Sequence, residues 1–283
     1  MKPDVKTLVN TGTVTLEDNN IESPELESEL LLRHVLKLAR SDYFSNLKQL
    51  IEEKHVEAFK DLLNMRCAHK PIAYILGSTE FMGLKMKVDE NTLIPRPETE
   101  ILVENVLKYD SSEFPEIIDL GTGSGNIAVS LAFLGKYKVT AVEINSRAIE
   151  VAKTNACRHN VDDRIVFLNE DMLGVADRCI DKYDILVSNP PYVMKEDYLL
   201  LQEEIKQEPV SALLAENSGL FFILYIIENI QRLVRKKGLF FLEFGYNQKE
   251  AIEKAVNESR YISDYSIIKD YNNMDRILTG NVI

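Results

Sequence analysis

The sequence predicts an α/β protein in which a doubly wound sheet follows a separate helical module. Strand and helix patterns alternate from about residue 98 onward, which indicates a mostly parallel sheet. Residues 1 to about 70 show helical periodicity without this alternation, so they form a module of their own. The chain has 283 residues, 45% of them hydrophobic, which is enough for one large or two modest domains with a full core.

The domain boundaries follow from the change of pattern. We expect a helical domain over residues 1–70, a hairpin linker over 71–97 and an α/β domain over 98–283. In the linker, polar and apolar residues alternate over 84–88, and the turn residues 89–91 follow directly. This combination predicts a short β-hairpin between the two domains.

The α/β domain is expected to contain strands that alternate with amphipathic helices. Strands are predicted at 116–120, 138–144, 165–168, 183–188, 239–244, 265–269 and 276–279. Helices are predicted at 126–134, 146–159, 219–234 and 248–258. The last two strands can pair with each other, so we expect the sheet to end in an antiparallel edge.

Composition narrows the class of partner. The formal net charge is −12, which argues against a protein that coats nucleic acid by bulk electrostatics, although a local basic groove stays possible. Cys67, Cys157 and Cys179 are far apart and form no C-x-x-C pair, so we interpret them as free thiols rather than metal ligands. We find no apolar stretch that would span a bilayer and no signal peptide, and we expect a cytoplasmic protein without a membrane or metal site.

A glycine-rich turn joins the first predicted strand to the first helix of the α/β domain. Its glycines follow G-x-G-x-G spacing, whereas dinucleotide-binding turns have G-x-G-x-x-G. A ligand with an amino-acid end can place its carboxylate at the positive helix N-terminus, and Asp119 can favour its ammonium group. A turn without a ligand is the plainer alternative. The candidate residues are Asp119, Gly121, Thr122, Gly123, Ser124 and Gly125.

Two further carboxylates follow the next predicted strands. Glu143 ends a strand about 22 positions after the first glycine, where a carboxylate can accept both ribose hydroxyls, although it could also be a solvated surface charge. Asp171 follows the third strand and can accept from an adenine amino group, with Met172 packed on the base. A loop aspartate is more often a cap or turn residue.

The most informative motif is Asn189-Pro190-Pro191-Tyr192, which follows the predicted strand at 183–188. Both prolines have a fixed φ and no N–H, so their carbonyls are acceptors without a neighbouring donor. Such a pocket suits a planar NH2 group, which needs two acceptors and an aromatic face. The alternative is a Pro-Pro turn that only closes a strand.

Together these motifs predict a methyl transfer. Glu143, Asp171 and the glycine turn describe an adenosine with a charged amino-acid tail and no phosphate, which is S-adenosylmethionine (SAM). The Asn189 side-chain oxygen and the Pro190 carbonyl can hold an acceptor NH2 group in line with the methyl group, and Tyr192 can pack on its plane. Catalysis would then rest on proximity and electrostatic positioning.

At these motifs the chain resembles the HemK/PrmC family, which methylates the side-chain N5 of a glutamine in class-1 peptide chain release factors. The resemblance covers nearly the whole chain. Its most specific part is the Leu-Ile-Pro-Arg-Pro-Glu-Thr-Glu stretch at 93–100. Other matching stretches are Glu29–Leu36, Pro71–Gly77, Glu80–Gly83, Glu208–Pro209, Leu242–Gly245 with Gln248, and Asp275–Arg276.

The resemblance implies a Rossmann-like, seven-stranded class I methyltransferase sheet and the product S-adenosylhomocysteine. It assigns the glycine turn, Glu143, Asp171, Met172 and Asn189 to the cofactor, and Asn189 through Tyr192 to the substrate glutamine. It implies that Phe81 and Arg96 lie near the cofactor methionine and the substrate entrance, where a core aromatic and a surface salt bridge are the alternatives. The helical domain is expected to dock the release factor and its Gly-Gly-Gln loop, and no nucleic acid is expected.

Some positions depart from the family pattern. Gln207 stands where the family usually has Tyr before Glu-Pro, 215–220 replaces a glycine-rich stretch, and Leu224 or Tyr225 replaces an arginine. Asn273 replaces a glycine. These departures concern loop geometry and partner fit rather than the reaction.

The sequence leaves three other functions open. The same loop can methylate the amino group of a flipped nucleobase, but the acidic composition argues against it. A ribosomal-protein glutamine is a closer alternative, although the 93–100 stretch favours the release factor. A non-catalytic cofactor-binding scaffold would need neither an intact glycine turn nor an intact Asn-Pro-Pro-Tyr loop.

Overall fold

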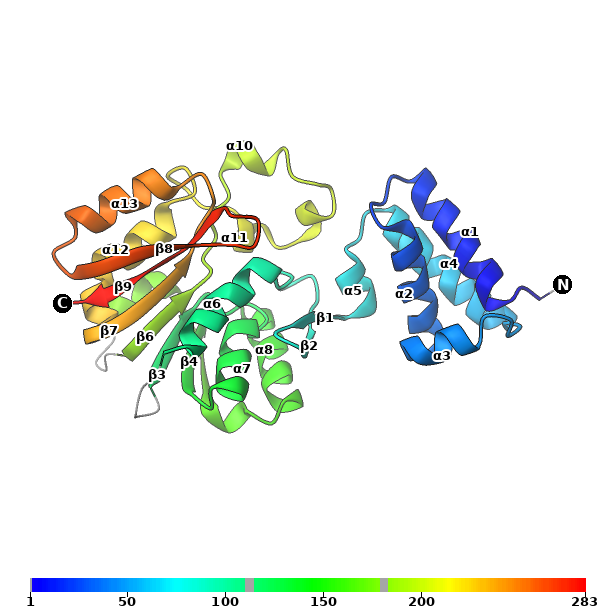
Figure 1. Cartoon of the computed structure of the whole chain (residues 1–283), viewed down its shortest axis with the longest axis horizontal. Helices are drawn as coiled ribbons and strands as arrows, with labels where there is room; N and C mark the ends of the chain where they lie inside the picture. The colour runs from blue at the N-terminus through cyan, green and yellow to red at the C-terminus, as the bar shows by residue number, and fades with distance from the viewer. Residues whose placement is uncertain (1, 110–114, 179–182) are drawn as a thin grey trace. The chain divides into compact units, whose positions relative to one another are not determined.

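The computed structural model describes residues 2–109, 115–178 and 183–283, which form two compact units (Figure 1). The first unit comprises the residues up to Gly77 together with Glu203–Gln207. The second comprises Ser78–Gln202 and Glu208–Ile283, and it contains the whole seven-stranded sheet.

The first unit is helical. Its elements are α1 (Val5–Asp18), α2 (Pro24–Leu36), α3 (Arg40–Ser45), α4 (Glu53–Cys67), α5 (Ile72–Leu76) and the 3-10 turn η2 (Ile205–Gln207). The core of this unit forms where α1 crosses α2 and α4, and a Cβ at Gly12 would come within 2.3 Å of Ser28 Oγ and 2.7 Å of Phe59. A glycine is therefore needed for α1 to pack this closely.

The segment Glu203–Gln207 joins this unit through a buried arginine. Arg66 on α4 is 3% exposed and pairs with Glu27 on α2 at 2.5 Å and with Glu204 at 2.7 Å. Because two carboxylates share one guanidinium, the buried positive charge is neutralised.

The predicted hairpin is present, but its turn was placed wrongly. Strand β1 (Ser78–Phe81) pairs with β2 (Leu84–Lys87), so the turn is Met82-Gly83 and not residues 89–91. Both turn residues have positive φ, +52° at Met82 and +71° at Gly83, as a two-residue hairpin turn requires. Methionine is an unusual first residue for such a turn, so the sequence did not signal it.

The second unit is the predicted doubly wound α/β fold. Its strands are β3 (Glu116–Leu120), β4 (Lys138–Glu143), β5 (Ile165–Asn169), β6 (Tyr183–Ser188), β7 (Val234–Glu243), β8 (Ile262–Lys269) and β9 (Asp275–Val282). They lie in the order β5-β4-β3-β6-β7-β9-β8, and β9 is antiparallel to both of its neighbours. The predicted fold class, including the antiparallel edge, is confirmed.

Helices cover both faces of this sheet (Figure 1). One core contains side chains of α6 (Pro97–Leu107), α7 (Asn126–Leu134) and α8 (Ser146–Arg158). The opposite core contains those of α9 (Met172–Arg178), α12 (Phe221–Leu233) and α13 (Lys249–Glu258). Adjacent residues of β3 alternate between the two cores, Ile117 in one and Ile118 in the other, as a strand buried on both faces requires. The remaining elements are η1 (Asp162–Arg164), α10 (Lys195–Tyr198) and α11 (Val210–Leu213).

Some element bounds differ from those predicted. Strand β7 begins at Val234, five residues before the predicted start at 239, and the short helix α9 was not predicted. Cys67 and Cys157 are free thiols, whereas Cys179 lies outside the described residues. Within the described ranges, no helix combines the length and apolarity needed to cross a membrane.

Candidate active site

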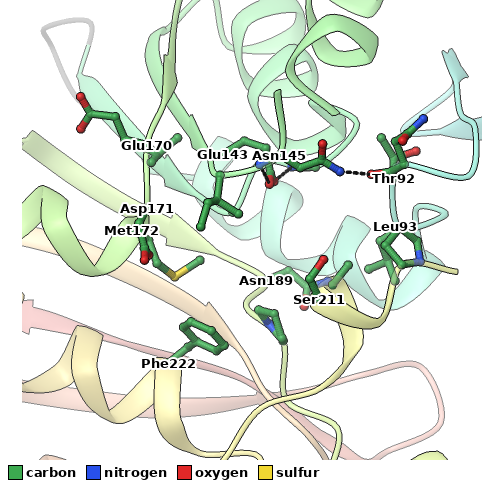
Figure 2. A pocket seen from close by; sticks show the side chains of 18 of the residues that line it. Thr92, Leu93, Glu143, Asn145, Glu170, Asp171, Met172, Asn189, Ser211 and Phe222 are labelled. Carbon is green, nitrogen blue, oxygen red and sulfur yellow. Dashed lines mark hydrogen bonds between the residues drawn. The ribbon is translucent and has the colours of Figure 1, made fainter. Parts of the chain in front are cut away.

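A cavity of about 230 Å³ lies at the carboxyl edge of the sheet (Figure 2). Loops that follow β3, β4, β5 and β6 contribute to its wall because the carboxyl ends of parallel strands share one edge. Sequence-predicted residues on this wall are Gly121, Gly123, Glu143, Asp171, Met172, Asn189 and Pro191. The structure thus brings together candidates that are up to 70 positions apart in the chain.

The glycine turn has a backbone that only glycine adopts readily. Gly121, Gly123 and Gly125 have φ of +76°, +54° and +79°. A Cβ at Gly123 would meet nothing within 4 Å, whereas one at Gly121 would lie 3.0 Å from Met172 Cε. Gly125 instead permits close helix packing, since its Cβ would lie 3.0 Å from that of Ala152 on α8.

Asp119 lies beneath this turn and is fully buried. Thr122 Oγ1 donates to Asp119 Oδ2 at 2.5 Å, whereas Oδ1 makes no hydrogen bond. Burial raises the pKa of Asp119 to about 7, and the Glu143 carboxylate acts in the same direction. Asp119, Thr122, Ser124 and Gly125 are not among the described residues that line the cavity.

Glu143, the last residue of β4, holds the glycine turn through hydrogen bonds. Its Oε2 accepts from the Gly123 N–H at 3.0 Å, and its Oε1 accepts from the Asn145 N–H at 2.8 Å. Burial raises the pKa of Glu143 above its ordinary range, although these N–H groups oppose the shift. Asn145 caps α8 and donates through Nδ2 to the Asn91 carbonyl at 3.2 Å, the contact drawn in Figure 2.

Asp171 caps a helix and also lines the cavity. Its Oδ1 accepts from the Leu173 N–H at 3.0 Å, so it caps the first turn of α9. It also lies on the cavity wall beside Met172.

Among the described residues, the charged side chains on the cavity wall are all acidic. Its ionisable groups are the carboxylates of Glu143, Glu170 and Asp171, and no Lys, Arg or His lines it among the described residues. A phosphate-bearing ligand needs donors or cations, so this wall suits a neutral or cationic ligand. Sequence reasoning missed several lining residues, chiefly Leu93, Ile144, Asn145, Ser211 and Phe222.

Asn189 is held by a buried chain of hydrogen bonds. Its Nδ2 donates to Thr99 Oγ1 at 3.0 Å, and Thr99 Oγ1 donates to Glu243 Oε2 at 2.7 Å. Tyr192 donates through its hydroxyl to Glu243 Oε1 at 3.2 Å. Burial raises the pKa of Glu243 to about 7 and raises the pKa of Tyr192 above its ordinary value.

A second, smaller cavity of about 40 Å³ adjoins Asn189. It is lined by Arg96, Asn189, Pro190 and Tyr192, together with Leu93, Val193, Ala212 and Leu213. The Arg96 guanidinium pairs with Glu208, whose other oxygen accepts from the Ile94 N–H at 2.9 Å. Phe81, in contrast, is 1% exposed in the core and lines neither cavity.

Gln248 and Gly219 also constrain the loop from Asn189 to Tyr192, at its Tyr192 end. Gln248 Nε2 donates to the Tyr192 carbonyl at 3.1 Å and to the Ser218 carbonyl at 3.2 Å. Gly219 has a φ of +77°, and a Cβ there would lie 2.2 Å from the Tyr192 carbonyl oxygen. The glycine is therefore required for this close approach.

Comparison with known proteins identifies the family. Residues 7–77 match the model of the PrmC N-terminal domain, and residues 97–236 match the methyltransferase small domain. A release factor glutamine methyltransferase of Chlorobaculum tepidum is 36% identical over 282 residues, 96% of this chain and 95% of the relative. The chain belongs to the release factor glutamine methyltransferase family. A relative with this name in Clostridium botulinum is 34% identical over 97% of this chain and 98% of its own length.

Solved structures support the fold of this methyltransferase. A methyltransferase from Pyrococcus furiosus superposes with a TM-score of 0.53 at 19% identity, covering 78% of this chain and 98% of its own. The hMettl16 catalytic domain gives a TM-score of 0.56 at 19% identity, covering 78% of this chain and 82% of its own. Membership in a methyltransferase family implies the use of SAM.

Proposed function

We propose that this methyltransferase transfers a methyl group from SAM to the side-chain N5 of the glutamine in the Gly-Gly-Gln motif of class-1 release factors. One observation carries the proposal, in addition to the names of its relatives. Asn189 lines both the large anionic cavity and the small cavity beside it. A donor in the first and an acceptor in the second would meet at this side chain.

The larger cavity fits SAM better than a phosphate-bearing nucleotide. SAM carries a sulfonium and an ammonium group and no phosphate, and three carboxylates line the wall. We assign the ribose to Glu143 and the adenine to Asp171 and Met172. The methionine end is assigned to the glycine turn, below which Asp119 has a buried oxygen without a hydrogen bond.

The smaller cavity suits the acceptor amide. When bound, SAM supplies an activated methyl group, so the protein needs only to hold the nitrogen in line. We assign the two amide hydrogens to Asn189 Oδ1 and the Pro190 carbonyl, with Tyr192 bordering the amide plane. Pro191 would contribute from the wall of the larger cavity. With SAM bound, these residues would hold the nitrogen in line with the methyl group, and the nitrogen would release its proton to solvent after it gains the methyl group.

The remaining assignments concern the partner. We propose that the helical unit docks the release factor, that Arg96 lies at the substrate entrance, and that the enzyme works in the cytoplasm, where translation ends. Phe81 can contribute only from the core, through the packing of the hairpin.

The test compares three acceptors. The protein is incubated with methyl-labelled SAM and, separately, a class-1 release factor, ribosomal proteins, or DNA and RNA. We expect label on the release factor, and none on a release factor whose Gly-Gly-Gln glutamine is replaced by alanine. Label on nucleic acid or ribosomal protein with an unlabelled release factor would contradict the proposal.

A further inference from the structure

Two buried residues outside both cavities hold the Asn189 amide. Thr99 lies in the first turn of α6 and Glu243 at the end of β7, and each is 1% exposed. Strand register explains why Glu243 meets Asn189. Ser188, the last residue of β6, pairs with Leu242, so Asn189 directly after β6 lies beside Glu243 at the end of β7.

The polarity of these hydrogen bonds admits one arrangement while Glu243 is ionised. A carboxylate only accepts, and its two oxygens receive the Tyr192 and Thr99 hydroxyl hydrogens. Thr99 has a single hydroxyl hydrogen, so its oxygen can only accept from the amide. It therefore selects the Nδ2 group of Asn189 and turns Oδ1 away from Thr99.

We propose that Thr99 and Glu243 are positioning residues that set the flip state of the Asn189 amide, so that Oδ1 rather than the NH2 group faces the acceptor glutamine. The inference rests on the proposed function, since it matters only if the acceptor carries an NH2 group. If the Asn189 amide were rotated by 180°, its NH2 group would face the NH2 group of the acceptor glutamine. Two hydrogen-bond donors would then oppose each other, and no hydrogen bond would form. No described residue donates to Oδ1, so it is free to accept from the substrate.

Protonation of Glu243 would reverse the donor and acceptor roles in the hydrogen bonds that link Asn189, Thr99 and Glu243. A protonated carboxyl can donate to Thr99, which releases the Thr99 hydrogen for Asn189 Oδ1 and favours the flipped amide. The ionisable groups that face Glu243 are Tyr192, Arg276 on β9 and Glu98 on α6. Burial and Glu98 raise the pKa of Glu243, whereas Arg276 and the hydrogen bonds from Thr99 and Tyr192 lower it, giving about 7. Turnover should therefore fall as the pH drops through this value.

The experiment compares Thr99→Val with Thr99→Ser, which keeps the hydroxyl, and with Thr154→Val at an exposed site on α8 as the matched control. Release-factor methylation is measured from about pH 5.5 to 9, with SAM affinity measured separately. We expect Thr99→Val to lower kcat about tenfold or more with SAM affinity nearly unchanged, and to lose the decline near pH 7. Thr99→Ser and Thr154→Val should keep both turnover and that decline.

Glu243→Gln provides a second test that does not depend on how Thr99→Val folds. A glutamine has one acceptor oxygen for two hydroxyls, so we expect reduced turnover without the decline near pH 7. Wild-type turnover and an unaltered pH profile in either variant would overturn the positioning role and leave the proposed function intact. A wild-type protein that fails to methylate release factor would overturn the proposed function, and the positioning role with it.

Discussion

Two buried carboxyls at the carboxyl edge of the sheet have a similarly raised pKa but differ in how completely their oxygens are hydrogen-bonded. Asp119 at the end of β3 and Glu243 at the end of β7 both have a pKa of about 7 because of burial. Asp119 leaves one oxygen without a hydrogen bond, whereas both oxygens of Glu243 accept from neighbouring hydroxyls. We infer that the first belongs to a ligand-binding region and the second to a rigid support.

The largest expected effect concerns Asn189, which lies between the two regions. Asn189→Ala should abolish methyl transfer, because it removes the oxygen that orients the acceptor. SAM affinity should stay within about tenfold, or about 1.4 kcal/mol, because the rest of the larger cavity is intact. Kinetics and SAM titration check this, with Asn257→Ala on the exposed face of α13 as the control. Near-native turnover would refute the orientation argument.

A smaller effect on function is expected from a substitution in the ligand-binding region, at Glu143. Glu143→Gln replaces a charged acceptor by a neutral one and should weaken SAM binding about 10- to 100-fold. Turnover at saturating SAM should change much less, because Glu143 does not line the smaller cavity. Glu150→Gln, on exposed α8 surface, is the matched control. If Glu143→Gln lowered turnover at saturating SAM as much as it lowered SAM affinity, the division into a ligand-binding region and a supporting region would be wrong.

Glycine substitutions compare the two regions in terms of stability. Gly219→Ala should cost about 2 kcal/mol or more and slow turnover, because its Cβ would overlap the Tyr192 carbonyl. Gly123→Ala should cost about 1 kcal/mol, from its positive φ alone, since nothing lies within 4 Å of the added Cβ. Chemical denaturation measures both values. Equal costs would show that the contact with Tyr192 does not constrain the loop.

The smallest expected effect is on the pH dependence of stability. Raised pKa values mean that the folded protein binds more protons than the unfolded chain between about pH 4 and 7. The free energy of unfolding should therefore fall as pH rises through this window and level off above it. Asp119→Asn and Glu243→Gln should each flatten that slope in denaturation series across pH. An unchanged slope in both variants would contradict the assigned burial.

Local sequence patterns predicted the residues of the ligand-binding region better than the residues that support Asn189. The glycine turn, Glu143 and Asn189 could be found because each lies in a short motif next to a predicted strand. Thr99 and Glu243 were visible only as members of family-like stretches, and their contact joins positions 144 residues apart. Their role depends on the register between β6 and β7, which no local pattern encodes. Phe222 was missed for the same reason, because α12 returns to the cavity from a distant part of the chain.

The most direct test of the account is mass spectrometry of a class-1 release factor after incubation with this protein and SAM. We predict that the peptide containing Gly-Gly-Gln gains one methyl group on the glutamine side chain, and that Asn189→Ala abolishes the modification while still binding SAM. An unmodified glutamine with wild-type protein, or a modified one with Asn189→Ala at the wild-type rate, would contradict the account.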